Sequence, residues 1–185
     1  MGKDHADIDD RLRGFIEAQH VFFVATAPLS EAGHVNVSPK GLGAFRVLGP
    51  REVAYLDYVG SGAETIAHLR ENGRITVMFC AFEGAPKIVR LHGRGEVVEP
   101  GDASFDELRG SFDAQVEPRC VIKVSVDRVS DSCGFGVPLY TAAGPRTQLA
   151  EWTRRKGAEG LRTYQRENNA RSIDGLPALR WVAPE

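Results

Sequence analysis

The sequence has few cysteines, no long apolar run and no clustered metal ligands. Cys80, Cys120 and Cys133 are far apart and follow no paired spacing, so the pattern predicts neither a disulfide framework nor a zinc site. No run is long enough to cross a bilayer. The polar N-terminus, MGKDHADIDD, lacks the apolar segment of a signal peptide. We therefore expect a cytoplasmic protein with no metal centre and no membrane association.

An excess of charge of either sign is also missing. The chain has 23 Lys and Arg residues against 25 Asp and Glu, which gives a formal net charge of -2 at pH 7. No basic block stands out, so nucleic acid is not expected as a partner. A length of 185 residues with 42% hydrophobic content is sufficient for one domain with a proper core.

The stretch from Glu52 to Asn72 combines a strand, a glycine turn and a helix start. β-branched and aromatic residues fill 52–59, which is typical of a buried strand. Gly60-Ser61-Gly62 ends the strand, and Ser61-x-x-Glu64 matches a capping box. Free backbone N–H groups at such a helix start favour a phosphate, although the same pattern also begins helices that bind nothing. A dinucleotide-binding turn is disfavoured because Thr65 replaces its third glycine.

The rest of the chain predicts strands with helices at the periphery. Strands are expected over 20–27, 34–38, 44–48, 74–82, 87–98 and 120–129. Helices are expected over 4–19, over 102–110, and over 147–169 with a break at Gly157 or Gly160. A single helix inserted among the strands excludes a doubly wound parallel sheet. The pattern therefore predicts a mainly β, α+β fold built on an antiparallel barrel, whose closure would remove exposed strand edges.

Four segments follow one another in a distinctive order. They are VNVSPKG (35–41), YLDYVGSGAET (55–65), HLRENGRITVMFCAF (68–82) and KIVRLHGRGEV (87–97). This succession resembles the pyridoxamine 5′-phosphate oxidase-like superfamily of FMN-binding split barrels. The resemblance implies a six-stranded antiparallel split β-barrel over residues 1–137, with a C-terminal helical extension over 138–185 that packs on the barrel or on a dimer partner. It also implies a homodimer that holds FMN at the subunit interface and acts on a small molecule.

The resemblance also implies a set of cofactor-binding residues. In chain order they are Val37, Ser38, Lys40, Asp57, Tyr58, Ser61, Gly62, Thr65, Lys87 and Ile88. The first three correspond to the strand that follows the isoalloxazine ring toward the ribityl phosphate, and the next two to a strand end beneath the cofactor. Three more form the phosphate turn, and the last two replace an Arg-Gln pair of the oxidases. The segment 133–136 corresponds to the part that approaches the partner's cofactor.

The chain departs from the oxidases at the phosphate turn. They carry Ser-Arg-Lys where this sequence has Ala63-Glu64-Thr65, so an acidic side chain stands near a group of about -1.5 to -2 charges. We expect Glu64 to turn back to the Ser61 backbone. The countercharge is expected from Lys40, Lys87 or Arg90. The C-terminal LRWVAPE (179–185) also differs from the oxidases, so pyridoxamine phosphate is not carried over as the substrate.

Two classes of function agree with these residues. One is an FMN-dependent oxidoreductase that transfers hydride at flavin N5, with the protein supplying orientation and a dry cleft. The other is a flavin-binding module without turnover, such as a redox sensor or cofactor reservoir. A deazaflavin or haem in place of FMN is a third possibility. No catalytic side chain is identified, because His34 and His92 lie on expected strands, where a lone histidine is more often a packing or surface residue.

Overall fold

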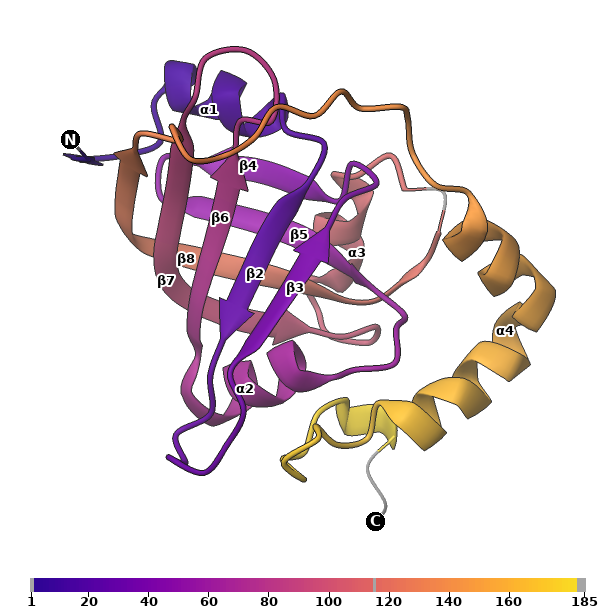
Figure 1. The fold of residues 1–185 in the computed structure, drawn as a ribbon. Coiled ribbons are helices and arrows are strands. Elements are labelled where there is room, and N and C mark those ends of the chain that lie inside the picture. Colours follow the sequence, from indigo (N-terminus) through magenta and orange to yellow (C-terminus); the bar gives the residue numbers. More distant parts are fainter. Residues whose placement is uncertain (1, 115, 183–185) are drawn as a thin grey trace.

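Alternating apolar residues build one antiparallel sheet in the computed structural model, which describes residues 2–114 and 116–182 (Figure 1). Its strands are β1 (Lys3–His5), β2 (Phe22–Thr26), β3 (Asn36–Lys40), β4 (Phe45–Gly49), β5 (Glu52–Tyr58), β6 (Arg74–Cys80), β7 (Ile88–Val98) and β8 (Pro118–Ser132). The helices are α1 (Asp10–Glu17), α2 (Glu64–Asn72), α3 (Phe105–Gly110), α4 (Gln148–Asn168) and the short 3-10 helix η1 (Arg180–Val182). None of the helices in the described ranges combines the length and apolar content that a bilayer crossing needs.

The sheet curls without closing. Its order is β3-β2-β6-β7-β8-β5-β4, with β1 paired to β8, so β3 and β4 are its ends. The predicted split-barrel fold class is confirmed. The described residues form eight strands rather than six, and the sheet keeps two free edges. β8 accounts for part of the difference, because its 15 residues are long enough to pair with β5, β7 and β1.

Aromatic side chains fill the interior where the two ends of the sheet, β3 and β4, face each other without pairing in the described part of the chain. We call this gap the open seam. The ring centroid of Phe22 on β2 lies 5.1 Å from that of Phe45 on β4 and 5.5 Å from that of Tyr55 on β5. Phe79 on β6 lies 4.9 Å from Phe45. These edge-to-face contacts join strands that do not share backbone hydrogen bonds. The core is therefore continuous where the sheet is not.

The first predicted helix is wrong in its N-terminal part. Residues 3–5 form β1, and α1 begins only at Asp10. Asp9 sets this start because its Oδ1 accepts a hydrogen bond from the Leu12 N–H at 2.8 Å. At the other end of the chain, the break expected in the last helix is confirmed at Gly157, which has φ 66° inside α4.

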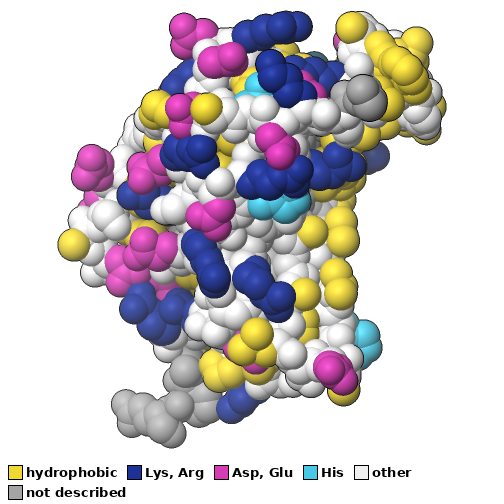
Figure 2. All heavy atoms as spheres, turned by 90° about the vertical axis from the view of Figure 1, so that its left-hand side faces the viewer, with side chains coloured by type: hydrophobic (Ala, Val, Ile, Leu, Met, Phe, Trp, Pro, Cys, Tyr) yellow, Lys and Arg dark blue, Asp and Glu magenta, His cyan; other side chains and the backbone are white. Residues whose placement is uncertain are grey.

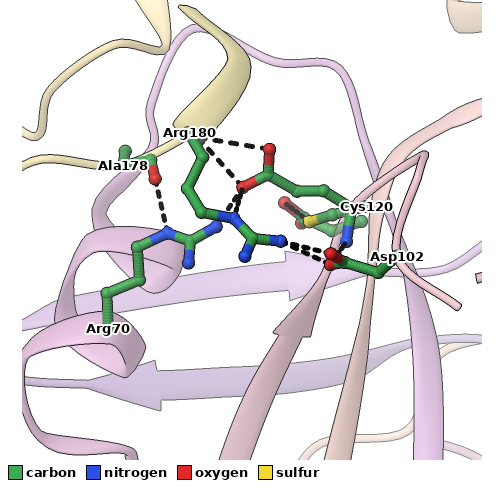
Figure 3. A network of polar contacts seen from close by, with 7 residues as sticks. Arg70, Asp102, Cys120, Ala178 and Arg180 are labelled. Atoms are coloured by element: carbon green, nitrogen blue, oxygen red, sulfur yellow. Dashed lines mark hydrogen bonds and ion pairs between the residues drawn. The ribbon is translucent and has the colours of Figure 1, made fainter. Parts of the chain in front are cut away.

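The C-terminal segment, which we define as residues 169–182, packs on the barrel. Figure 1 shows α4 as a curved arm beside the sheet, after which the chain returns next to α2. Leu179 is 1% exposed. Arg70 of α2 donates to the Ala178 carbonyl at 2.6 Å and pairs with Glu99, whose carboxylate also accepts from the Arg180 backbone N–H at 3.0 Å (Figure 3). These contacts fix the segment to α2 and to the end of β7.

Candidate functional site

A cavity of about 700 Å³ lies where β3, the turn before α2 and the C-terminal segment meet. Its volume is in the ordinary range for small-molecule sites. The lining residues are His34, Val35, Asn36 and Val37 at β3, Ser61, Gly62 and Glu64 at the turn, and Glu167, Asn168, Arg171, Ser172 and Ile173. The structure thus brings three of the expected cofactor-binding residues, Val37, Ser61 and Gly62, into one cavity.

Side-chain hydrogen bonds hold β3 against the start of α2. The Asn36 amide donates to Thr65 Oγ1 at 3.0 Å, and its Oδ1 accepts from Ser38 Oγ at 3.2 Å. Thr65 is only 4% exposed, so its hydroxyl faces this network instead of solvent. Ser38 and Thr65, both expected at the cofactor, are therefore close to the cavity, where they fix the distance between its two walls.

Glu64 does not form the predicted capping box. α2 begins at Glu64 with Ala63 as its N-cap, and no side-chain hydrogen bond caps the helix. Glu64 Oε1 instead accepts from the Ile173 N–H at 3.2 Å. Its carboxylate folds over Gly62, where an added Cβ would lie 2.2 Å from Oε2. The expectation that Glu64 turns back to the Ser61 backbone is wrong, because the C-terminal segment provides a competing donor.

Asp57 is buried between two cations. Its Oδ1 accepts from Lys40 Nζ at 2.5 Å and its Oδ2 from Arg119 Nε at 2.8 Å. Burial alone would raise the pKa of this carboxyl, but the charges of Arg119 and Lys40 outweigh it and lower the pKa to about 2. Lys40 thus faces inward and shares the single negative charge of Asp57 with Arg119. Sequence reasoning missed Arg119, since no local pattern shows that β8 begins beside the end of β5.

Three other expected residues lie away from the cavity. Lys87 Nζ is 3.6 Å from Asp131 Oδ2 and 5.1 Å from the ring centroid of Phe15. Ile88 is on β7, which β2 and β6 separate from β3. Tyr58 lines a different cavity, of about 530 Å³, with residues of the segment before α4. The structure places this part of the expected set at other positions on the barrel.

The C-terminal segment is hydrogen-bonded to the two other walls of the cavity, the turn before α2 and the loop before β3. Asn169, which is fully buried, donates to the Gly60 carbonyl at 2.9 Å. Asp174 Oδ1 lies 2.7 Å from His34 Nδ1, and its Oδ2 accepts from the His34 backbone N–H at 2.9 Å. These two hydrogen bonds from His34 lower the pKa of Asp174. His92, by contrast, lines a separate cavity of about 430 Å³.

The chemistry available at the cavity is that of organic ligands. In residues 2–114 and 116–182, no group of three or more His, Cys, Asp or Glu side chains is arranged to hold a metal ion. Ser61 and the backbone of the α2 start offer donors, and Arg171 offers positive charge. Figure 2 shows basic and acidic side chains interspersed on another face of the barrel, without one uniform patch.

An open antiparallel barrel with one inserted helix and a cavity at the helix start defines a split-barrel protein. The sequence profile of the family described as pyridoxamine 5′-phosphate oxidase matches residues 8–133. Over 194 residues the chain is 43% identical to the pyridoxamine 5′-phosphate oxidase family protein ustO of Aspergillus flavus, covering 95% of this chain and 77% of that protein. The chain belongs to the pyridoxamine 5′-phosphate oxidase family.

Solved structures show the same fold at low sequence identity. HupZ of Group A Streptococcus matches with a TM-score of 0.51 and 22% identity, over 66% of this chain and 91% of HupZ. A Lactobacillus delbrueckii protein, provisionally named a pyridoxamine 5′-phosphate oxidase, matches with a TM-score of 0.52 and 16% identity. That match covers 69% of this chain and 98% of the Lactobacillus protein. At these identities the likeness establishes architecture and nothing about ligands.

Proposed function

We propose that this protein is an FMN-dependent oxidoreductase that acts on a small molecule. The observation that carries the proposal is the cavity of about 700 Å³ in which β3, the start of α2 and Arg171 meet. Family membership supports a flavin at this place. When bound, FMN supplies hydride transfer at its N5 atom, and the protein provides binding, orientation and electrostatics.

The residues present fit a phosphorylated ring cofactor. The nine-residue α2 directs its first backbone N–H groups toward the turn, where Ser61 adds a hydroxyl donor. Val35 and Val37, which are 71% and 62% exposed, give the edge of β3 an apolar surface suited to a flat ring. Glu64 opposes the phosphate, and its charge weakens binding without removing these donors.

His34 is the side chain best placed to move a proton at the cavity. Asp174 binds its Nδ1 and its backbone N–H together, which holds the ring in one orientation. With Nδ1 donating to the carboxylate, Nε2 accepts a proton from a ligand or returns one. We propose this role for His34, with Asp174 as the residue that positions it.

We also propose that the protein acts as a homodimer. The β3 edge and the segment after β8 expose apolar side chains that a partner would cover: Val35, Val37, Phe135, Leu139 and Tyr140, each at least 62% exposed. A second copy over the β3 edge would exclude water from the cavity. Sedimentation equilibrium tests this, since a monomer at micromolar concentration would contradict it.

The absorbance spectrum of freshly purified protein tests the flavin. We expect the absorbance bands of oxidised flavin, and denaturation of the protein should release FMN. If the protein fails to quench the fluorescence of added FMN, the proposal is contradicted. Stopped-flow mixing with NADH, NADPH or reduced deazaflavin then separates an enzyme from a passive flavin carrier. Rapid reduction by any donor supports an oxidoreductase, whereas a bound flavin that no donor reduces supports the carrier. Parallel titrations with haem and deazaflavin test the other two cofactors.

A further inference from the structure

The expected countercharges near the turn are engaged elsewhere. Lys40 and Arg119 both bind Asp57, and Lys87 lies against Asp131. Arg90 Nη1 donates to Ser132 Oγ at 3.0 Å on the far strand pair. None of these side chains lines the cavity of about 700 Å³. A phosphate in this cavity therefore needs a cation from another part of the chain.

Arg171 of the C-terminal segment has the properties that such a cation requires. It lines the cavity together with Ser61 and Gly62. Its Nη1 donates to the Gly175 carbonyl at 2.8 Å, which leaves the other guanidinium N–H groups for a ligand. Within the described part of the chain it forms no ion pair, although Glu64 and Glu167 line the same cavity. An arginine that shares a cavity with two carboxylates and pairs with neither is available to an anion.

The backbone around Arg171 is fixed by a tight reversal of the chain. Arg171 and Pro177 form an antiparallel bridge, and the Ser172 N–H donates to the Leu176 carbonyl at 2.9 Å. Gly175 permits this reversal with φ 80°. Asn169 ties the same segment to Gly60 at 2.9 Å. The backbone that carries Arg171 is thus held in position relative to the turn before any ligand arrives, and less backbone entropy is lost on binding.

We propose that Arg171 is the phosphate-binding cation of the cofactor site, and that the C-terminal segment is one wall of this site. The proposal rests on the proposed function, because it assigns the charge that holds the phosphate of FMN. In the arrangement expected for the oxidases, the basic residues lie in the turn itself. In this chain the turn carries Glu64, and the proposed cation lies in the C-terminal segment. The family profile ends at residue 133, so the assigned cation lies outside the part of the chain that the profile describes.

Paired titrations with FMN and riboflavin test this assignment, because riboflavin has the same ring and ribityl chain without the phosphate. The full-length wild type, R171Q, R171K and the control R155Q are titrated by flavin fluorescence quenching. Arg155 is an exposed arginine of α4 that lines none of the cavities described above. R171Q is expected to weaken FMN binding about tenfold, the size of one charge-assisted hydrogen bond. Riboflavin binding should change less than about twofold, R171K should lie between, and R155Q should match the wild type.

Each other outcome has a distinct meaning. Equal FMN affinity of R171Q and wild type would overturn the assignment while leaving the proposed function intact. Equal losses for FMN and riboflavin would also overturn it, because the arginine would then support the fold of the segment and not the phosphate. If the wild type binds neither flavin, the proposed function fails and the assignment fails with it. Circular dichroism of each variant confirms that the fold is retained.

Discussion

Lys40 and Asp57 form an ion pair of 2.5 Å that joins β3 to β5, two strands that are not neighbours in the sheet. The pair lies on the open side of the barrel, where no strand pairing among residues 2–114 and 116–182 connects the sheet ends β3 and β4. Arg119 binds the second carboxylate oxygen at 2.8 Å. A buried carboxylate between two cations thus holds the seam, and its removal leaves two positive charges without their partner.

Replacing Asp57 by Ala is therefore expected to lower the free energy of unfolding by about 3–5 kcal/mol, the usual effect of breaking a buried ion pair. Urea unfolding followed by circular dichroism measures this change. The matched control is Asp127→Asn, at an exposed aspartate of β8 whose side chain forms no ion pair among the described residues. A loss below about 1 kcal/mol for D57A would show that the triad does not hold the seam.

The lowered pKa of the Asp57 carboxyl predicts that the free energy of unfolding decreases at acid pH. Its folded-state pKa is about 2, against 3.8 for the ordinary group. Because the folded pKa is the lower one, the stabilisation is complete above about pH 4 and is lost as the pH falls toward 2, with a total of about 2 kcal/mol. The difference in unfolding free energy between wild type and D57N should shrink over this interval. A difference that stays constant down to pH 2 would contradict the prediction.

His68 predicts a second pH effect, nearer neutrality. This histidine is fully buried, its Nδ1 lies 2.9 Å from Thr26 Oγ1, and burial lowers its pKa below 6.5. The folded state keeps the ring neutral, so stability is complete above pH 6.5 and decreases as the pH falls below it. The H68Q variant should show a smaller decrease between pH 7 and pH 5. An NMR titration in which His68 ionises at or above pH 6.5 would refute the assignment.

Glu64 is expected to limit the affinity for a phosphorylated ligand. Its carboxylate folds over Gly62 at the start of α2 and accepts a hydrogen bond from the Ile173 N–H. Replacing it by Gln removes a negative charge close to the expected phosphate while keeping a similar shape. FMN should bind E64Q several-fold more tightly, with riboflavin affinity unchanged, and the gain should diminish at high salt. Tighter binding of both flavins would instead indicate a change in cavity shape.

The contact between His34 and Asp174 is expected to control the mobility of the C-terminal segment. Asp174 accepts two hydrogen bonds from His34. These bonds hold the part of the C-terminal segment around Asp174 against the loop before β3. In D174N, amide hydrogen exchange of residues 170–176 should become faster, whereas the exchange of β7 and β8 should not change. If residues 170–176 exchange at the same rate in D174N and in the wild type, Asn169 and the buried Leu179 fix the segment without this contact.

The fold was largely predictable because its strands carry strong local signals. Each expected strand is present within a few residues, and the break at Gly157 is where the pattern placed it. β1 was not predictable, since Lys3–His5 is polar and forms a strand only by pairing with β8. The division into residues 1–137 and 138–185 stays a prediction.

The site was less predictable because its contacts join distant parts of the chain. Val37, Ser61 and Gly62 do meet at one cavity. Local pattern gave no sign that Arg119 would neutralise Asp57, or that Ile173 would attract Glu64 away from the predicted cap. A side chain's partner depends on burial and on the path of the backbone, and neither can be read from neighbouring residues. The cofactor roles of all the expected residues stay predictions.

The sheet order has a consequence for how the chain acquires its fold during synthesis. β8 is the last strand to be made, yet it lies between β7 and β5. Until residue 132 has left the ribosome, the β3-β2-β6-β7 sheet and the β4-β5 hairpin are separate pieces with unpaired edges. Such distant pairing makes assembly slow relative to a helical protein of this size. The nascent chain therefore passes through a period in which its edges are open to pairing with other chains.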